Sequence, residues 1–409
     1  MNIYLQELKR FLSKKSVRVF LVVGLFFTFL ISFITYRSVQ YDDISSGDTI
    51  TYFGKEAIDH FNEDNKASEG YLTEEKITKV VKSYKEILNN ENVNSRENLS
   101  EDAKKNISKF DPILRVITYP YTITTSGSLL DVNELDTEKD LNFYQSCYDA
   151  LERDIKQKYD NDKITEFALE KYKEVNKPFY YGGYFSEDIL FFVNIFITVL
   201  SLICILISSQ CIVEDKENYL DSIFRTTRNG RNKYICSKIL ALASIISLYL
   251  ILNISIYYGT IKYLYTNGLD SSFQMLLFNQ LSISNLTIGK VILSVFLLSI
   301  LFTIASSMMS IFVAINSKVS MVSSAISSVL FFIPSLLYGK KLFKSIFYFL
   351  PSLGLGTAEN SLIEQYQKFE FVKLPGKILW VPKFLVIMAL INIALYLLLS
   401  IKSYNKIEQ

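Results

Sequence analysis

The chain has 409 residues, half of which are hydrophobic, and a formal net charge of +2. This total hides a division: residues 37–187 hold 30 Asp/Glu and 20 Lys/Arg, a charge of −10, whereas the rest holds 11 acidic and 23 basic residues, a charge of +12. One acidic block in an apolar, basic chain predicts a membrane protein with one large soluble insert, not a nucleic-acid-binding protein. Four cysteines, one histidine and no Cys-x-x-Cys pair argue against a zinc site of the usual kind.

The chain begins with a basic segment that precedes an apolar run. Residues 1–18 place Tyr4, Leu8 and Phe11 at helical spacing between charges, which predicts a cytoplasmic interfacial helix on the inner leaflet. Residues 19–36 are then the first membrane span, and the basic residues before them favour a cytoplasmic N-terminus. A signal peptide is the weaker interpretation, because no small-residue cleavage site follows Tyr36.

The acidic block at 37–187 is long enough to form a domain, and we expect it outside the cell. Its patterns predict mainly α-helix, with little β-structure. Thr73 is expected to cap a helix that ends near Asn89, and Ser100 a short helix that ends before Pro112. Further helices are expected over 141–159 and from a cap at Asp162 to about residue 176, and a short strand over 115–123.

The remaining residues, 188–409, hold the second to sixth spans. A helix needs about 20 apolar residues to cross a bilayer core. Six runs of the whole chain reach or nearly reach this length: Val19–Tyr36, Ile189–Val213, Ile239–Ile261, Val291–Ile315, Val319–Tyr338 and Phe384–Ile401. The fold class is therefore an α-helical polytopic membrane protein with both termini in the cytoplasm. The loop 339–383 falls outside, although its lysines would favour the cytoplasm, and Ser345–Leu355 is expected to dip into the outer leaflet.

Small polar residues recur in the fourth and fifth spans. Such residues let helices approach closely, and their hydroxyls can bond across an interface. The simpler interpretation is that these residues serve helix packing. The more specific interpretation is that they line a pathway for an amphiphilic substrate. The residues are Ser299, Thr303, Ser306, Ser310, Ser320, Ser324 and Ser328.

No catalytic set or resident cofactor is expected in the chain. Of its four Gly-Lys pairs, none has the spacing of a phosphate-binding loop with a following Ser or Thr. The spans also lack the buried acids, histidines or arginines of a proton or sodium relay. If the protein transports a substrate, the energy is therefore expected to come from a partner.

The 214–238 loop joins the second and third spans on the cytoplasmic side. Its beginning is acidic, an apolar patch follows, Asn229-Gly230 signals a turn, and a basic segment leads back to the membrane. Binding of lipid headgroups explains the basic part, but the apolar patch on a polar loop favours a protein partner.

These features resemble the permease subunit of a type-2 ABC exporter. Such permeases have six spans, an interfacial elbow helix, a coupling helix between spans two and three, and in a subset a large domain between spans one and two. They commonly show Glu at the end of span two, an apolar segment, and a basic entry to span three. Here Glu214 takes the first position, and the entry holds Thr227, Gly230, Arg231 and Lys238.

The resemblance implies a complex of two permeases, identical or homologous, with two ABC ATPase subunits that bind ATP and magnesium. The loop would dock into an ATPase groove, with Leu220, Ile223 and Phe224 as anchors and Arg225 and Arg228 in ion pairs at the rim. The residues assigned to ATPase coupling are thus Glu214, Leu220, Ile223, Phe224, Arg225, Arg228, Gly230 and Arg231.

Several alternatives stay open. Within transport, a permease of the lipoprotein-release or peptide-sensing kind is disfavoured by six spans and a helical insert. In another class, a receptor or immunity protein would bind a peptide through 37–187 and signal through the loop. The substrate of an exporter would be an antimicrobial peptide, a lipid or a drug. The expected location is a plasma membrane, of a Gram-positive bacterium by the absence of disulfides and of a cleavable signal.

Overall fold

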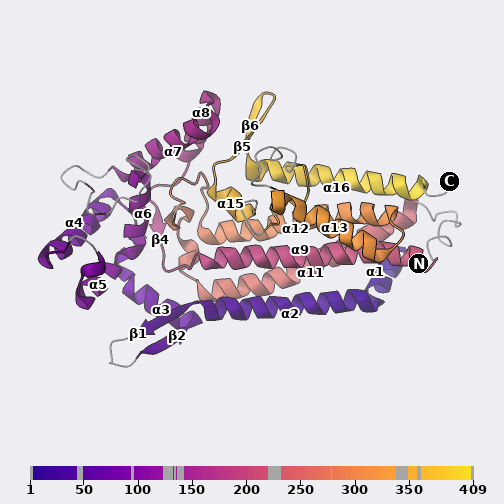
Figure 1. Cartoon of the computed structure of the whole chain (residues 1–409), viewed down its shortest axis with the longest axis horizontal. Helices are drawn as coiled ribbons and strands as arrows, with labels where there is room; N and C mark the ends of the chain where they lie inside the picture. The colour runs from indigo at the N-terminus through magenta and orange to yellow at the C-terminus, as the bar shows by residue number, and fades with distance from the viewer. Residues whose placement is uncertain are drawn as a thin grey trace.

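A computed structural model describes residues 3–43, 49–93, 96–122, 132, 135, 142–219, 232–277, 279–337, 349–356 and 361–406. Two bodies share one long molecule: a bundle of long apolar helices, and a soluble body at one end of it (Figure 1). The N- and C-termini lie together at the opposite end of the bundle.

Six helices of the described chain are long and apolar enough to cross a membrane, which confirms the predicted fold class. The ends of the helices lie within about seven residues of the ends of the predicted spans. Five of the six helices are longer than predicted, because polar residues at their ends can remain helical outside the hydrocarbon. These helices are α2 (Lys15–Ser38), α9 (Asp188–Glu217), α11 (Asn232–Leu264), α12 (Ile288–Asn316), α13 (Ser320–Leu337) and α16 (Val381–Lys406).

The interfacial helix is shorter than predicted. Helix α1 covers Ile3–Ser13, and the chain bends at Lys14, whose backbone is extended. Residues 15–18 belong to α2, since Val17 is buried against the bundle while the basic side chains around it face outward. Helix α1 is amphipathic: Glu7 and Phe11 are buried, and Leu5 and Leu12 are exposed on the other face.

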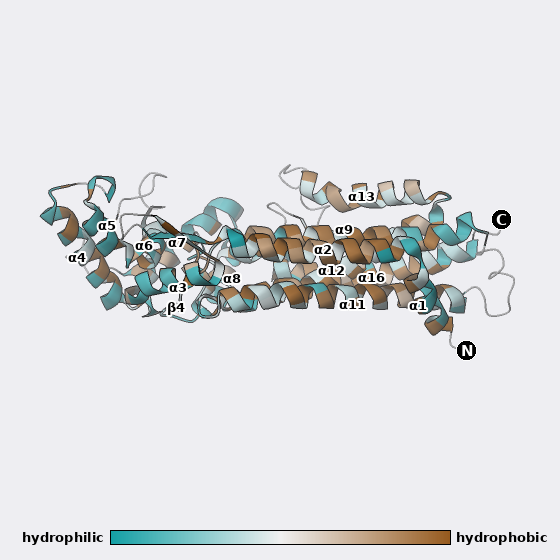
Figure 2. Cartoon of the chain, turned by 90° about the horizontal axis from the view of Figure 1, so that it is seen from below, coloured by the Kyte–Doolittle hydropathy of each residue, from teal (hydrophilic) through white to brown (hydrophobic). Residues whose placement is uncertain are grey.

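Helix α9 lies at the centre of the bundle and packs against α2, α12 and α13, while α12 also packs against α16. The bundle helices are largely hydrophobic along their length (Figure 2), and many of their large apolar side chains are exposed, as lipid contact requires. Helix α13 lies at the margin and buries little of its surface; Met321 and Leu336 on it are among the most exposed apolar residues.

The soluble body is mainly helical, as predicted. It opens with an antiparallel hairpin in which Gln40 pairs with Phe53 and Asp43 with Ile50. The short strands β3 and β4 also pair antiparallel, Gly70 with Tyr181. Its elements are β1 (Gln40–Asp43), β2 (Ile50–Phe53), α3 (Gly54–Asp64), β3 (Gly70–Tyr71), α4 (Glu74–Asn90), α5 (Glu101–Ser108), α6 (Asp111–Thr122), α7 (Phe143–Tyr159), α8 (Asp162–Lys173) and β4 (Tyr180–Tyr181), with 3-10 turns at Lys66–Ser68 and Arg96–Asn98.

Two local predictions for this body are confirmed and two are wrong. The side chains of Thr73 and Ser100 cap α4 and α5, because each accepts a hydrogen bond from the backbone amide three residues later in the chain. Residues 115–122 of the predicted strand 115–123 instead belong to α6 (Asp111–Thr122), because tertiary packing of its apolar face outweighs β-propensity, and residue 123 lies outside the described chain. Asn161, not Asp162, caps α8, since its side chain accepts from the amide of Ile164.

The loops at the same end of the bundle complete the soluble body. Met275, Leu281, Ile283 and Phe371 are buried in its core although they lie far from the insert in sequence. The elements in these loops are 3-10 turns at Gly268–Asp270 and Phe273–Met275, then α15 (Leu362–Gln367) and the hairpin β5 (Phe371–Leu374) and β6 (Lys377–Trp380). The described part of 339–383 therefore lies on the insert side in spite of its lysines.

Part of the segment expected to dip into the membrane is described. Residues 349–356 form turns, and residues 345–348 lie outside the described chain. Thr198 donates to the carbonyl of Leu355 at 2.7 Å, and Asn392 donates to that of Phe349 at 3.0 Å. Each donor is about ten residues into its helix, or about 15 Å from the helix start. The segment thus enters the bundle as non-helical backbone covered by protein.

Candidate functional site

Four consecutive charged residues, Glu214 to Glu217, end helix α9 immediately before the 214–238 loop leaves the bundle. The first two and the last two contact different parts of the structure. Glu214 and Asp215 point toward α1 and the start of α11, and Lys216 and Glu217 reach the junction of α12 and α13. The end of α9 is therefore connected to four other helices at the point where the loop begins.

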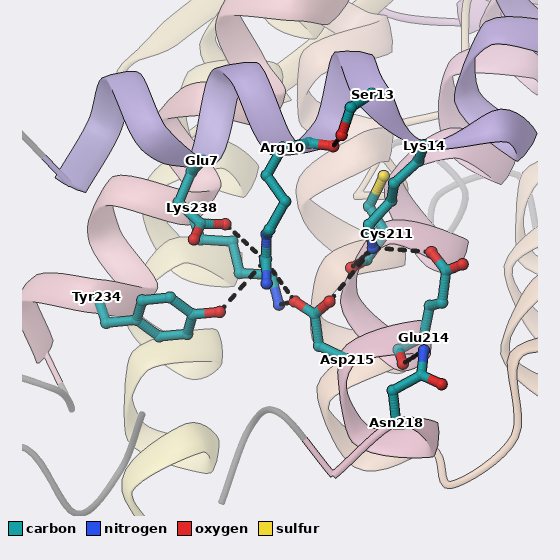
Figure 3. A network of polar contacts seen from close by, with 10 residues as sticks. All are labelled: Glu7, Arg10, Ser13, Lys14, Cys211, Glu214, Asp215, Asn218, Tyr234 and Lys238. Carbon is teal, nitrogen blue, oxygen red and sulfur yellow. Dashed lines mark hydrogen bonds and ion pairs between the residues drawn. The ribbon is translucent and has the colours of Figure 1, made fainter. Parts of the chain in front are cut away.

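Asp215 is the centre of this arrangement and is 1% exposed. Its carboxylate accepts from Arg10 Nη2 at 2.6 Å and from Lys14 Nζ at 3.2 Å. Lys238, in the second turn of α11, is equally buried and donates to the same carboxylate (Figure 3). One carboxylate thus joins α1, the bend before α2, and α11.

Two further acids surround the three cations. Arg10 Nη2 also donates to Glu7 Oε2 at 2.6 Å, and Lys14 Nζ lies 2.7 Å from Glu214 Oε2. The cluster of Glu7, Arg10, Lys14, Glu214, Asp215 and Lys238, here called the charge cluster, therefore balances three positive with three negative charges. Tyr234 accepts from Arg10 through its hydroxyl at 3.3 Å.

Burial makes this balance necessary. Removing a charge from water costs several kcal/mol, which close partners with good hydrogen-bond geometry offset. Burial raises the pKa of Glu7 above the ordinary value although Arg10 acts against it. Burial would lower the pKa of Lys14, yet Asp215 and Glu214 outweigh it and the pKa is raised. Loss of one member leaves its partners buried and uncompensated, so the cluster acts as a unit.

Lys216 and Glu217 extend the same joint to the other side of α9. The ammonium of Lys216 donates to the carbonyls of Ala314 at 3.3 Å, Ser317 at 3.2 Å and Ile315, at the C-terminal end of α12. The Oε1 atom of Glu217 accepts from the amide of Ser320 at 2.7 Å, at the first residue of α13. A cation at a helix C-terminus and an anion at an N-terminus both match the helix dipole.

Most residues assigned to coupling from the sequence lie outside the described chain. Glu214 is in the charge cluster, and Tyr219, the last described residue before the gap, is 79% exposed. The sequence predicted the position of the loop but missed Glu7, Arg10, Lys14, Asp215 and Lys238 as one site. A signal was present: Glu7 is an acid on the apolar face of an amphipathic helix. The residues not described are Leu220, Ile223, Phe224, Arg225, Arg228, Gly230 and Arg231.

The serines of the fourth and fifth spans face α9 and each other. Thr303 lies 2.7 Å from Ser201, and Ser310 donates to Ser327 at 3.0 Å. Ser324 reaches Ser209 at 3.4 Å. Three of the others bond locally or are buried: Ser299 and Ser328 donate to carbonyls of their own helices, and Ser306 is fully buried. Ser320 contributes its amide to Glu217. These contacts support close packing of α9, α12 and α13.

Among the described residues, no three His, Cys, Asp or Glu side chains are grouped so that they could hold a metal ion. The charge cluster itself has its carboxylates occupied by lysine and arginine. The cluster is therefore a joint between helices that is held by ion pairs.

Six candidate spans among the described residues, a soluble body at one end of the bundle, and a buried joint at the other end define a multi-pass α-helical membrane protein. A sequence model described as "ABC-2 family transporter protein" matches residues 14–402. The chain therefore belongs to the ABC-2 family of transporter proteins and is a membrane transport subunit of the plasma membrane. No curated protein and no solved structure matches it.

Proposed function

We propose that the chain is the permease subunit of an ATP-driven exporter, moving an amphiphilic substrate outward with energy from a separate ATPase. The family implies a transporter complex with an ATPase. We propose the full assembly as two permeases, identical or homologous, with two ATPase subunits that hold ATP and magnesium.

The observation that carries the proposal is the joint at the end of α9. Asp215 and Lys238 lie 23 positions apart in the chain, at the two ends of the 214–238 loop, and form one buried ion pair. Arg10 ties the same carboxylate to α1. A displacement of the loop by a partner would therefore move α1, α9 and α11 together. Without these ion pairs, the loop could move while the helices stayed in place.

The charged end of α9 also contacts α12 and α13, the two helices whose serines contact α9. Because Lys216 holds the end of α12 and Glu217 the start of α13, the loop is also linked to the pair that packs on α9 through hydroxyl contacts. Closure of the ATPases around ATP would push on the loop, and this joint would convert the push into a rearrangement of α9, α12 and α13. A peptide, a lipid or a drug would fit a path along such weakly polar helix surfaces.

The orientation follows from the same assignment. An ATPase works in the cytoplasm, so the charge cluster and both termini would face inward and the soluble body outward. The basic residues before α2 support this side for the N-terminus.

The docking step is tested with the whole complex. Ile223→Asp and Phe224→Asp are expected to abolish co-purification of the ATPase, because each places a charge in an apolar contact. Ile50→Asp is the matched control, since Ile50 is exposed on the soluble hairpin far from the loop. Retention of the ATPase by both loop variants would overturn the docking proposal.

The coupling step is tested separately. Asp215→Asn is expected to retain the ATPase, whose contacts lie in the loop, but to reduce transport per ATP hydrolysed by about fivefold or more. The measurement uses monodisperse complex in vesicles, so that unfolded protein does not contribute. Unchanged transport per ATP would show that the cluster has no part in coupling.

A further inference from the structure

A cavity of about 680 Å³ lies at the opposite end of the bundle from the charge cluster, where the soluble body meets the membrane helices. Helix α8, the loop before α12 and β6 line its upper part, on the side of the soluble body, and α12 and α16 line its lower part. Its volume lies within the range of about 300–1,000 Å³ that is typical of ligand sites.

The upper part of the cavity carries polar as well as apolar residues, and one of them has a hydroxyl without a hydrogen bond. Ser284 lines it and is 3% exposed, and its hydroxyl has no hydrogen-bond partner in the described part of the chain. A buried hydroxyl without a partner is uncommon, and a bound water is its simplest partner.

The charge of the lining is positive. Lys171 and Glu174 neutralise each other, since the ammonium donates to both carboxylate oxygens, at 2.6 and 2.9 Å. Lys383, at the third residue of α16, is exposed and forms no ion pair with any described residue. The lining therefore presents one uncompensated ammonium.

The lower part of the cavity is apolar and open toward the bilayer. Leu297, Leu298 and Val386 line it, and Leu297 is 59% exposed. Leu297 lies nine residues beyond the start of α12 at Ile288, or about 14 Å along the helix. The lining thus reaches from the polar boundary well into the depth of the hydrocarbon.

We propose that this cavity binds a phospholipid with an anionic headgroup, taken from the leaflet on the side of the soluble body. The headgroup phosphate pairs with Lys383, and an acyl chain lies along Leu297, Leu298 and Val386. A free phosphate would leave the apolar part empty, and a zwitterionic lipid would place a second cation beside Lys383. The assignment stands apart from the coupling loop, which lies at the other membrane face.

The chain carries its own probe for this site. Trp380 is the single tryptophan of the sequence, and it lines the cavity. The full chain, reconstituted in vesicles that contain a brominated lipid, is expected to show stronger quenching of Trp380 by brominated phosphatidylglycerol than by brominated phosphatidylcholine. In mixtures, the anionic lipid is expected to be preferred about fivefold, the effect of one lysine near the membrane surface.

Matched variants separate the site from the bulk membrane. Lys383→Glu is expected to remove the preference and Val386→Phe to reduce quenching by filling the cavity, whereas Lys377→Glu and Ile387→Phe, neighbours outside the lining, are expected to leave both unchanged. Equal quenching by the two lipids, or a preference that survives Lys383→Glu, would overturn the proposal. Loss of quenching on addition of inorganic phosphate would assign the site to a free anion instead.

Discussion

Gly24 of α2 lies so close to Tyr249 of α11 that a Cβ atom at position 24 would be 1.5 Å from the phenol oxygen. The same two helices are joined further along by Thr28, which donates to Asn253 Oδ1 at 2.7 Å, and by Thr35 and Tyr257, whose oxygens are 3.0 Å apart. The first span is thus fixed to α11 by one small residue and two hydroxyl contacts.

Gly24→Ala is expected to displace α2 from α11 and to destabilise the protein by about 1–3 kcal/mol, the usual cost of overpacking. The readout is the thermal midpoint in detergent. Tyr249→Phe should restore part of the loss, since it removes the nearest atom and that hydroxyl has no hydrogen-bond partner among the described residues. Gly259→Ala is the control, because nothing lies within 4 Å of a Cβ there; an equal loss in both would contradict the close contact.

Asp215→Asn is expected to cost about 3–5 kcal/mol of stability, because it leaves buried cations without their central anion. Glu152→Gln removes one carboxylate from the exposed pair with Lys156 and is expected to cost less than about 1 kcal/mol. Both values come from thermal or denaturant unfolding of the purified chain. Similar losses in the two variants would show that the charge cluster is no more stabilising than a surface pair.

Tyr172 connects the soluble body to the loop before α12, since its buried hydroxyl donates to the carbonyl of Gln280 at 2.9 Å. Tyr172→Phe is expected to leave that carbonyl unsatisfied, at a cost of about 1–3 kcal/mol. Hydrogen exchange should then increase in residues 273–287. Tyr148→Phe, on the neighbouring helix α7, is the control. Unchanged exchange in Tyr172→Phe would contradict a role for this bond in holding the loop before α12 against the soluble body.

The four cysteines are expected to react unequally. Burial raises the pKa of Cys147 to about 12, so almost no thiolate forms near pH 8, and Cys204 and Cys211 are buried in α9. Cys236 is exposed near the start of α11. Mass spectrometry should find maleimide on Cys236 in the native protein and on the other three only after denaturation. Raising the pH to 9 should leave Cys147 protected, since this is still well below its pKa.

The same cysteine tests the proposed orientation. An impermeant maleimide should label Cys236 in opened but not in intact cells. A cysteine introduced by Lys156→Cys, exposed on α7, should be labelled in intact cells. The reverse pattern would place the soluble body in the cytoplasm and contradict the docking of an ATPase at the 214–238 loop.

The sequence by itself determined the fold class, the six spans and the mainly helical insert. These follow from hydrophobic runs of membrane length and from the spacing of apolar residues, which are properties of neighbouring positions. It failed at 115–123, where β-branched residues favour a strand, because burial of that face against other helices decides the local structure. The sequence also predicted where the loop after Glu214 begins, but it did not predict which residues contact the base of the loop.

Only the tertiary structure decided which distant charges meet. Arg10 and Asp215 lie 205 positions apart, so no periodicity relates them, and Glu7 resembles an ordinary acid until its burial is known. The cavity beside Trp380 depends likewise on α8, α12 and α16, which the chain brings together only when folded. Both sites require desolvation, and desolvation is a property of the packed molecule that a single sequence position does not carry.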